Sequence, residues 1–227
     1  MSKHLRLYIP GLSVHVMHRG HNKMTIFPEA TDCEHFLALL EAAAGRHQVR
    51  IHCYSLMVNH YHFIATPTAT DAMPRAMQQL GQRYVKYFNR KYQRTGTLWG
   101  GRYRAICIRD ERYWLTCLRY VELNPLRAQL VRAPELYRWS SYRAHAFGTR
   151  SRWLANHVVY DQLGETDEER QLAYRTICGV PLTDEELIQQ RLGVAAGTER
   201  IAEQADLVVT PFEDDDVARP EPRLSVG

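Results

Sequence analysis

The sequence predicts an α+β fold, in which a mostly antiparallel sheet with its helices occupies residues 1–147 and a helical appendage follows. Segments rich in β-branched and aromatic residues alternate with segments whose apolar residues recur at helical spacing. Two of the strand-like segments are separated by only two residues, a link short enough for an antiparallel hairpin. The charge balance also changes sign after the middle of the chain, which sets the C-terminal part apart.

The first strand and the first helix follow from simple patterns. Residues 13–18 (SVHVMH) alternate in polarity and are followed by turn-forming residues at positions 19–22. A stretch with apolar residues at helical spacing comes next. We expect Thr31 or Asp32 to cap this helix and Gly45 to end it.

A hairpin and a long helix come next. Residues 49–57 (VRIHCYSLM) and 60–65 (HYHFIA) are typical strands, and residues 58–59 link them. A helix over residues 71–92 carries apolar and aromatic residues on one side and basic residues on the other. The sequence Thr-Gly-Thr at residues 95–97 interrupts the helical pattern.

The last part of the core contains one strand and two helices. Residues 102–108 (RYRAICI) predict a fourth strand. Asp110 is a suitable cap for a helix that the pair Asn124-Pro125 would end, because the residue before a proline disfavours helical geometry. Another short helix is expected after Pro134.

The C-terminal part has a different composition. Residues 168–178 and 184–192 have helical patterns, and residues 198–205 favour a helix more weakly. The composition from residue 210 onward is typical of disorder. The expected organisation is a core domain over residues 1–147, a helical appendage over 148–209 and a disordered acidic tail over 210–227.

Composition excludes several classes of protein. The 227 residues are 45% hydrophobic and 24% charged, which is ordinary for a globular chain. No run approaches the ~20 apolar residues of a membrane span, and the first residues do not resemble a signal peptide. Five cysteines without a CxxC pair disfavour a disulfide scaffold and a cysteine-based zinc site. We therefore expect a protein of the reducing cytoplasm.

Positive charge is concentrated in the middle of the chain. The formal net charge of +4 divides into +1 over residues 1–74, +12 over 75–150 and −9 over 151–227. Such asymmetry favours a polyanionic partner for the middle block, and nucleic acid is the obvious candidate. A basic solvated surface balanced by the acidic end explains the charge equally well.

The most specific local motif is His60-Tyr61-His62. Side chains at positions i and i+2 of a strand point to the same face, so the two imidazoles should stand side by side. Two such imidazoles suit a metal ion, although an isolated HxH also occurs in ordinary strands. His15 would lie near the pair if its strand neighbours this one.

A second candidate is Tyr120 in the segment LRYVELNPLRA, where helical spacing puts Tyr120 and Asn124 on one face. A tyrosine beside an oxygen donor could be a nucleophile next to a metal ligand. Its phenol, with an ordinary pKa of about 10, would need activation or a nearby cation. A core tyrosine followed by Asn124 as a helix C-cap explains the same residues.

Basic and aromatic residues alternate between positions 83 and 104. Arginine and lysine neutralise phosphates, and aromatic rings stack on unpaired bases, so this mixture favours single-stranded nucleic acid over plain duplex. Several of the aromatic residues are expected on the core face of the long helix, whereas Trp99 lies in a glycine-rich loop. The candidate DNA-binding residues are Arg83, Lys86, Arg90, Lys91, Trp99, Arg102 and Arg104.

Taken in order, these segments resemble the single-tyrosine HUH transposases, and most of all their REP-associated tyrosine transposase branch. The resemblance covers residues 5–147 and implies a ferredoxin-like antiparallel sheet flanked by helices, as in HUH endonucleases. Its one departure near the histidines is Val58, where such proteins often have proline. The matching segments are YIPGLSVHVMHRGHNK, YSLMVNHYHFI, YVKYFNRKYQRTGTLWGGRYRA, RYVELNPLRAQLV and WSSYRAH.

The resemblance implies a residue for each step of a single-strand DNA cleavage reaction. His60 and His62 would bind Mg²⁺ or Mn²⁺, and Asn124 would supply another ligand. Tyr120 would attack the scissile phosphate and form a 5′-phosphotyrosine link with a free 3′-hydroxyl. Imidazoles favour transition metals over Mg²⁺, which makes Mn²⁺ the sensible metal to test. The phosphotyrosine link would retain the energy of the broken phosphodiester, so no nucleotide cofactor would be needed. The sequence indeed has no GxxxxGK[ST] phosphate-binding loop.

The same resemblance implies the partner and the setting. The branch recognises hairpins of repetitive extragenic palindromes, so we expect single-stranded or hairpin DNA as partner and no membrane. The protein would be a monomer or homodimer in the bacterial cytoplasm, associated with the nucleoid.

Other functions remain open at this stage. A non-catalytic module that binds DNA or RNA hairpins would need no metal. A relaxase typically places its tyrosine near the N-terminus, and replication initiators commonly carry two paired tyrosines, whereas here a single Tyr120 follows the histidines. A small-molecule metalloenzyme would leave the basic middle block unexplained.

Overall fold

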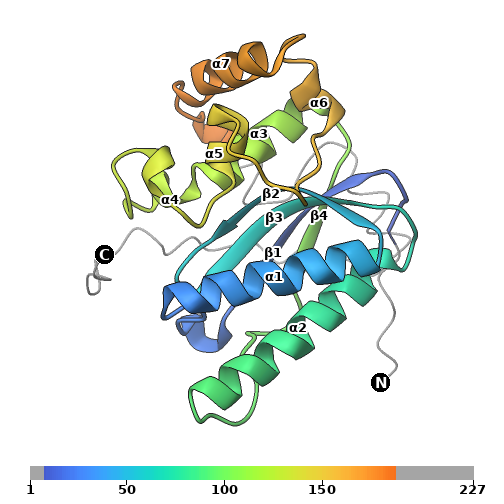
Figure 1. The fold of residues 1–227 in the computed structure, drawn as a ribbon, viewed down its shortest axis with the longest axis vertical. Coiled ribbons are helices and arrows are strands. Elements are labelled where there is room, and N and C mark those ends of the chain that lie inside the picture. Colours follow the sequence, from blue (N-terminus) through green and yellow to red (C-terminus); the bar gives the residue numbers. More distant parts are fainter. Residues whose placement is uncertain (1–7, 188–227) are drawn as a thin grey trace.

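The computed structural model describes residues 8–187. Its centre is a four-stranded sheet in the order β2-β3-β1-β4, in which all neighbouring strands are antiparallel (Figure 1). All four predicted strands are present, with ends within two residues of the prediction. The strands are β1 (Ser13–Arg19), β2 (Val49–Leu56), β3 (His60–Pro67) and β4 (Arg104–Ile108).

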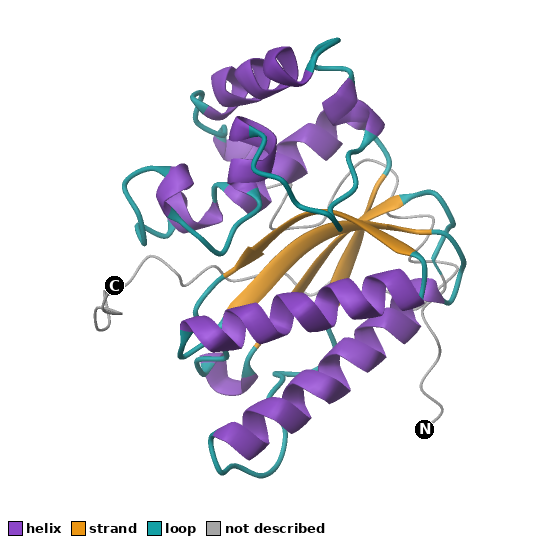
Figure 2. Cartoon of the chain, viewed as in Figure 1, coloured by secondary structure: helices purple, strands orange, loops and turns teal. Residues whose placement is uncertain are grey.

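The sheet lies between two helical layers (Figure 2). Two long helices, α1 (Ala30–Arg46) and α2 (Ala72–Lys91), cover one face. Helix α3 (Glu111–Glu122) covers the other face, and the short helices of the C-terminal part pack around it. These are α4 (Asn124–Arg127), α5 (Tyr142–Phe147), α6 (Val158–Asp161) and α7 (Asp167–Cys178), with single 3-10 turns at His21–Lys23 and Pro134–Leu136.

The two-residue repeat of β3 sorts its side chains between the two layers. Tyr61 and Phe63 pack in the hydrophobic cluster shared with α1 and α2. Ile64 packs in a second cluster, with Trp114 and other residues of α3. His62 shares the parity of Ile64 and therefore faces α3. Every residue of β3 is buried, because the strand has neighbours on both sides and helices above and below.

Both ends of α1 differ from the prediction. The N-cap is Glu29, and Asp32 is the third helical residue of a capping box, so neither Thr31 nor Asp32 caps the helix. The helix also continues past Gly45 to Arg46. The chain turns only at Gln48, whose φ of 54° is left-handed. Gly45 therefore lies inside the last turn of α1, and the left-handed residue that reverses the chain comes three positions later.

Buried Asp32 joins the start of α1 to the end of α2. Its carboxylate accepts hydrogen bonds from Tyr92 at 2.6 Å, Lys91 at 2.7 Å and Tyr87 at 2.8 Å. Burial raises the pKa of Asp32, but these donors, together with the Glu29 backbone N–H, outweigh that effect and hold it below the ordinary value. The two helices are thus fastened by a buried ion pair as well as by apolar packing.

Helix α3 begins as predicted, since the Asp110 side chain accepts a hydrogen bond from the Tyr113 backbone N–H at 2.9 Å. It ends at Glu122, but Asn124-Pro125 starts the short helix α4 instead of a loop. Proline is tolerated there because the first turn of a helix does not need its missing N–H.

The C-terminal part packs on α3. The short helix expected after Pro134 is only a single 3-10 turn over Pro134–Leu136, whereas α7 matches the helix predicted over residues 168–178. Tyr160 and Tyr174 join the hydrophobic cluster of α3, so the segment after residue 147 shares a core with it. The domain boundary at residue 147 stays a prediction. Residues 184–187 are helical, whereas the remainder of the predicted helix 184–192, the helix 198–205 and the tail 210–227 lie outside the described residues.

Within residues 8–187, no helix combines the length and the apolar character that crossing a bilayer requires.

Candidate active site

His60 and His62 stand side by side on the α3 face of the sheet, as their spacing predicts. Their ring centroids are 5.0 Å apart and nearly perpendicular. Both side chains are buried, with exposed fractions of 5% and 2%. The central position of β3 in the sheet fixes the direction of both rings.

Each histidine is oriented through its Nδ1 atom. His60 Nδ1 lies 2.6 Å from the side-chain oxygen of Asn59, and His62 Nδ1 lies 2.9 Å from Nε2 of His15 on β1. An amide oxygen can only accept, so His60 carries its proton on Nδ1 in this contact. The Nε2 atoms are therefore the donors that a metal would use, and hydrogen bonds behind the rings hold them in place.

Burial keeps the two imidazoles neutral. It lowers the pKa of His60 to about 3, with a further contribution from the Arg19 charge. Burial also holds the pKa of His62 well below its usual value, and His60, His15, Arg127 and Arg19 add to the effect. A neutral imidazole has the free lone pair that metal coordination requires.

Tyr120 lies on α3 directly against this group. Its ring centroid is 5.9 Å from that of His62 and 5.9 Å from that of His15, with edge-on geometry in both cases. The tyrosine is 4% exposed. The structure therefore brings together Tyr120 and His62, which lie 58 positions apart in the sequence.

Arg127 is a further member of the group that sequence reasoning missed. Its guanidinium carbon lies 4.1 Å from the centre of the Tyr120 ring. It also donates a long hydrogen bond, 3.5 Å, to the Tyr120 backbone carbonyl. The seven-residue separation equals two turns of an unbroken helix, but the break after Glu122 removes that signal from the sequence. If Tyr120 acts as a nucleophile, this arginine would be its nearby cation.

Asn124 lies at the start of α4, outside the helix that carries Tyr120. It is buried at the first position of α4, and the break after Glu122 means that Tyr120 and Asn124 do not share one continuous helix. In the described part of the chain, no hydrogen bond joins the Asn124 side chain to either histidine, and no group of three or more His, Cys, Asp or Glu side chains could hold a metal. The two histidines fit a metal site that is completed by other donors.

The predicted DNA-binding residues divide between the two faces of the sheet. Arg83, Lys86 and Arg90 are exposed on α2, on the face opposite Tyr120. Arg104 is on the histidine face, because it pairs with Met17, which in turn pairs with His62. Arg102 is exposed just before β4.

Two predicted DNA-binding residues are engaged inside the protein. The Lys91 ammonium pairs with Asp32 at 2.7 Å and with Glu29 at 2.9 Å. The Trp99 ring stacks on His18, with centroids 4.3 Å apart, and its indole nitrogen is buried with no hydrogen-bond partner among the described residues. These contacts explain both side chains without DNA, and their DNA-binding role stays a prediction.

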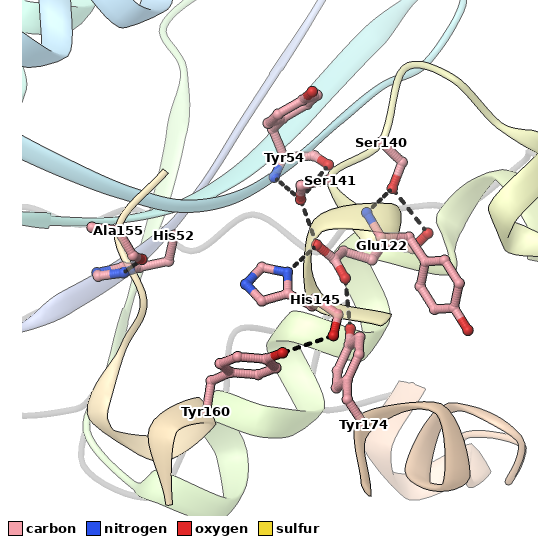
Figure 3. Close-up of polar contacts among 10 residues, drawn as sticks. His52, Tyr54, Glu122, Ser140, Ser141, His145, Ala155, Tyr160 and Tyr174 are labelled. Carbon is pink, nitrogen blue, oxygen red and sulfur yellow. Dashed lines mark hydrogen bonds and ion pairs between the residues drawn. The ribbon is translucent and has the colours of Figure 1, made fainter. Parts of the chain in front are cut away.

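A buried polar network holds the end of α3 (Figure 3). The Glu122 carboxylate, which has no exposed surface, accepts hydrogen bonds from Tyr174 at 2.7 Å and from the Ser141 hydroxyl, and it pairs with His145 at 2.8 Å. These partners come from α5, from the residue before it and from α7. The network fixes the helix end two residues after Tyr120.

Comparison with known proteins matches this arrangement to a family and a fold. The model of the family described as "Transposase IS200 like" matches residues 8–124. A REP-associated tyrosine transposase, solved bound to a REP hairpin, is similar with a TM-score of 0.54 and 19% identity over 70% of this chain and 93% of that chain.

Two other solved structures give weaker similarities. A Deinococcus radiodurans protein described as a transposase gives a TM-score of 0.37 and 16% identity, over 57% of this chain and 92% of that chain. The tRNA(His) guanylyltransferase of Saccharomyces cerevisiae gives 0.40 and 11%, over 78% and 82%. No curated protein sequence matches this chain.

Proposed function

Because this chain belongs to the IS200-like transposase family, we propose that it is a metal-dependent single-strand DNA endonuclease and transesterase with Tyr120 as its nucleophile. The observation that carries the proposal is the contact between the Tyr120 and His62 rings, at 5.9 Å. It puts a phenol beside two neutral, oriented imidazoles, and a phosphate placed there could reach both.

The proposed reaction exchanges one phosphate ester for another. The Tyr120 hydroxyl oxygen attacks the phosphorus, the bond to the 3′-oxygen breaks, and the phenol proton ends on the released 3′-hydroxyl. The phosphate remains a diester, now joined to the tyrosine at its 5′ side. Its charge does not change, and no nucleotide cofactor is consumed. A later attack by a 3′-hydroxyl on this link would restore the DNA backbone.

The side chains have separate tasks in this proposal. His60 and His62 would hold a divalent cation, Mn²⁺ or Mg²⁺, with Asn124 as a further candidate ligand, and such a cation polarises the phosphate and stabilises the leaving oxygen. Arg127 offsets negative charge as the Tyr120 phenol loses its proton. His15 keeps the His62 ring in its orientation.

Hairpin or single-stranded DNA is the proposed substrate. The similar REP-associated transposase was solved bound to a REP hairpin, and this chain has a strongly basic middle block. Arg104 and Arg19 lie on the histidine face of the sheet, where they can contact phosphates that approach Tyr120. Exposed Arg83, Lys86 and Arg90 are candidates for backbone contacts farther from the reaction.

The test is the formation of a covalent adduct. Purified protein is mixed with Mn²⁺ or Mg²⁺ and with labelled single-stranded palindromes from the flanks of its own gene, and a denaturing gel is run. We expect an adduct that Tyr120→Phe and chelation both abolish, while Tyr120→Phe still binds the hairpin. As a matched control, Tyr137→Phe should retain the adduct, because Tyr137 is bonded to the Leu56 carbonyl, outside the histidine group.

The same gel can reject the proposal. An adduct that persists in Tyr120→Phe would assign the nucleophile elsewhere. Tight hairpin binding with no adduct in either metal would instead support a non-catalytic hairpin-binding regulator.

A further inference from the structure

A basic cavity of about 480 Å³ lies beyond the outer edge of the sheet, next to β2. Its walls are formed by α1, by Tyr54 of β2 and by the chain from residue 138 to residue 154. Four arginines and a single carboxylate line it, which gives the cavity a formal excess of three positive charges. These charged residues are Arg138, Arg143, Arg150, Arg152 and Glu41.

Most of this charge is available to a ligand. Arg138 pairs with Glu34 at 2.9 Å. Arg143, Arg150 and Arg152 are exposed, and none of their guanidinium groups has a hydrogen bond or ion pair with another residue in the range 8–187. Three guanidinium groups around one concave surface repel one another, so an anion that binds between them relieves an unfavourable interaction. Guanidinium groups bind phosphate with two parallel hydrogen bonds.

One wall of the cavity is aromatic. The half-buried Trp153 ring stacks on Tyr54, with centroids 5.5 Å apart and an interplanar angle of 15°. Arginines next to an indole suit a ligand with both phosphates and flat rings. Unpaired nucleotides have that chemistry, whereas the bases of a duplex are already stacked and hidden.

The cavity is separate from the Tyr120 site and is held by the backbone. Tyr54 packs against the hydrophobic cluster on the α1 and α2 face of the sheet, whereas Tyr120 belongs to the cluster on the other face. The chain that carries Trp153 runs beside β2, where the Ala155 N–H donates to the Ile51 carbonyl at 2.8 Å. The arginine-bearing wall is therefore fixed to the sheet.

We propose that this cavity is a second DNA contact, which binds the phosphates of an unpaired strand that continues from the hairpin and takes one of its bases against Trp153. The inference rests on the proposed function, because it assumes that the chain binds hairpin DNA. It adds a site at the β2 edge of the sheet, lined by residues that are not part of the Tyr120 and histidine group. A substrate that occupies both sites would be longer than the hairpin itself.

The experiment compares two double variants on two DNAs. Arg143→Gln/Arg152→Gln removes two cavity charges. Arg46→Gln/Arg112→Gln removes two exposed charges that do not line the cavity. The affinity of the full chain is measured over a range of salt concentrations, for a hairpin alone and for the same hairpin with a single-stranded extension at either end.

The cavity variant should lose affinity only for an extended hairpin. We expect its affinity for the extended hairpin to fall roughly tenfold or more. The slope of log association constant against log salt concentration should become shallower by about 1.4, the value expected for the loss of two single-strand phosphate contacts. The control variant should bind both DNAs with nearly unchanged slopes. A further variant, Trp153→Leu, should weaken the extended hairpin without changing the slope, because stacking involves no counterion release.

The possible failures are distinguishable. If the wild-type chain binds neither DNA, the proposed function fails. If it binds both and the cavity variant matches the control, the hairpin function stands and the second site is wrong. An equal loss on both DNAs would show that the arginines contact the duplex stem, which also overturns the single-strand occupant.

Discussion

The Nε2 atom of His15 lies 2.9 Å from Nδ1 of His62, so a histidine on one strand supports a histidine on its neighbour. The antiparallel pairing of β1 with β3 creates this contact. His15 lies opposite Ile64, and Met17, two residues farther along β1, lies opposite His62. Hydrogen bonds of this kind fix the ring and raise the basicity of a metal-binding nitrogen. The site therefore includes a histidine outside the His-Tyr-His motif.

Replacing His15 should weaken metal binding. His15→Ala removes the support of the His62 ring but leaves both Nε2 donors, so Mn²⁺ affinity should fall roughly ten- to 100-fold. Isothermal titration of Mn²⁺ into the full chain measures it. His47→Ala is the control, because His47 bonds to Gln79 on the opposite layer. Unchanged Mn²⁺ affinity in His15→Ala would remove His15 from the site.

Replacing Arg127 should slow the adduct more than it weakens DNA binding. Arg127→Gln removes the cation 4.1 Å from the Tyr120 ring and keeps a similar side-chain length. Loss of one preorganised charge typically costs about 100-fold in rate, and because Arg127 is only half-buried we expect a loss of roughly tenfold to 100-fold. Single-turnover kinetics at saturating DNA measure this rate. A variant that loses affinity but keeps its rate would make Arg127 a DNA contact only.

Two neighbouring lysines on α2 should behave differently. Lys91→Met leaves Asp32 buried without its ammonium partner, so the free energy of unfolding should fall by about 3 kcal/mol. Lys86 is exposed, and Lys86→Met should change stability by less than about 0.5 kcal/mol. Urea unfolding measures both. If the two variants are equally stable, the buried pair does not fasten α1 to α2.

Stability should decline below neutral pH because of buried His52. Its ring bonds to the Ala155 carbonyl at 2.7 Å and to the Thr66 hydroxyl at 2.8 Å. Burial lowers the pKa of His52 to about 4, against 6.5 for an ordinary histidine. The unfolded chain thus binds a proton between these values and the folded chain does not. The resulting stability is complete above pH 6.5 and is lost as the pH falls toward 4.

This effect is measurable as a difference between two variants. From pH 7 to pH 5, His52 should account for about 2 kcal/mol of the lost unfolding free energy. Urea unfolding at the two pH values should show that His52→Gln loses less stability over this interval than the wild type, whereas His47→Gln loses as much. Equal losses in all three proteins would mean that His52 is protonated in the folded chain.

Local patterns predict the strands, whereas one failed prediction has a local cause and another has a partner distant in sequence. Alternation along residues 60–65 predicted both the strand and the shared face of its histidines. Gly45 failed as a helix end because Gln48 takes the left-handed conformation after it. Lys91 looked like a free cation because its partner Asp32 lies 59 positions earlier.

The candidate site divides in the same way. His60, His62 and Tyr120 stand in recognisable motifs, and the strand order that adds His15 was a condition the sequence left open. Arg127 reaches the Tyr120 ring because the short helix α4 begins directly after α3, at the Asn-Pro pair from which the sequence predicts only a helix end.

The Glu122 carboxylate has a consequence for how such chains can diversify. Its partners Ser141, His145 and Tyr174 come from segments on both sides of residue 147. If relatives exchanged their C-terminal helices, the Glu122 carboxylate at the end of α3 would stay buried without its Tyr174 partner, unless the incoming segment brought an equivalent hydroxyl. The appendage and helix α3 are therefore coupled through one buried carboxylate, so a change in either constrains the other.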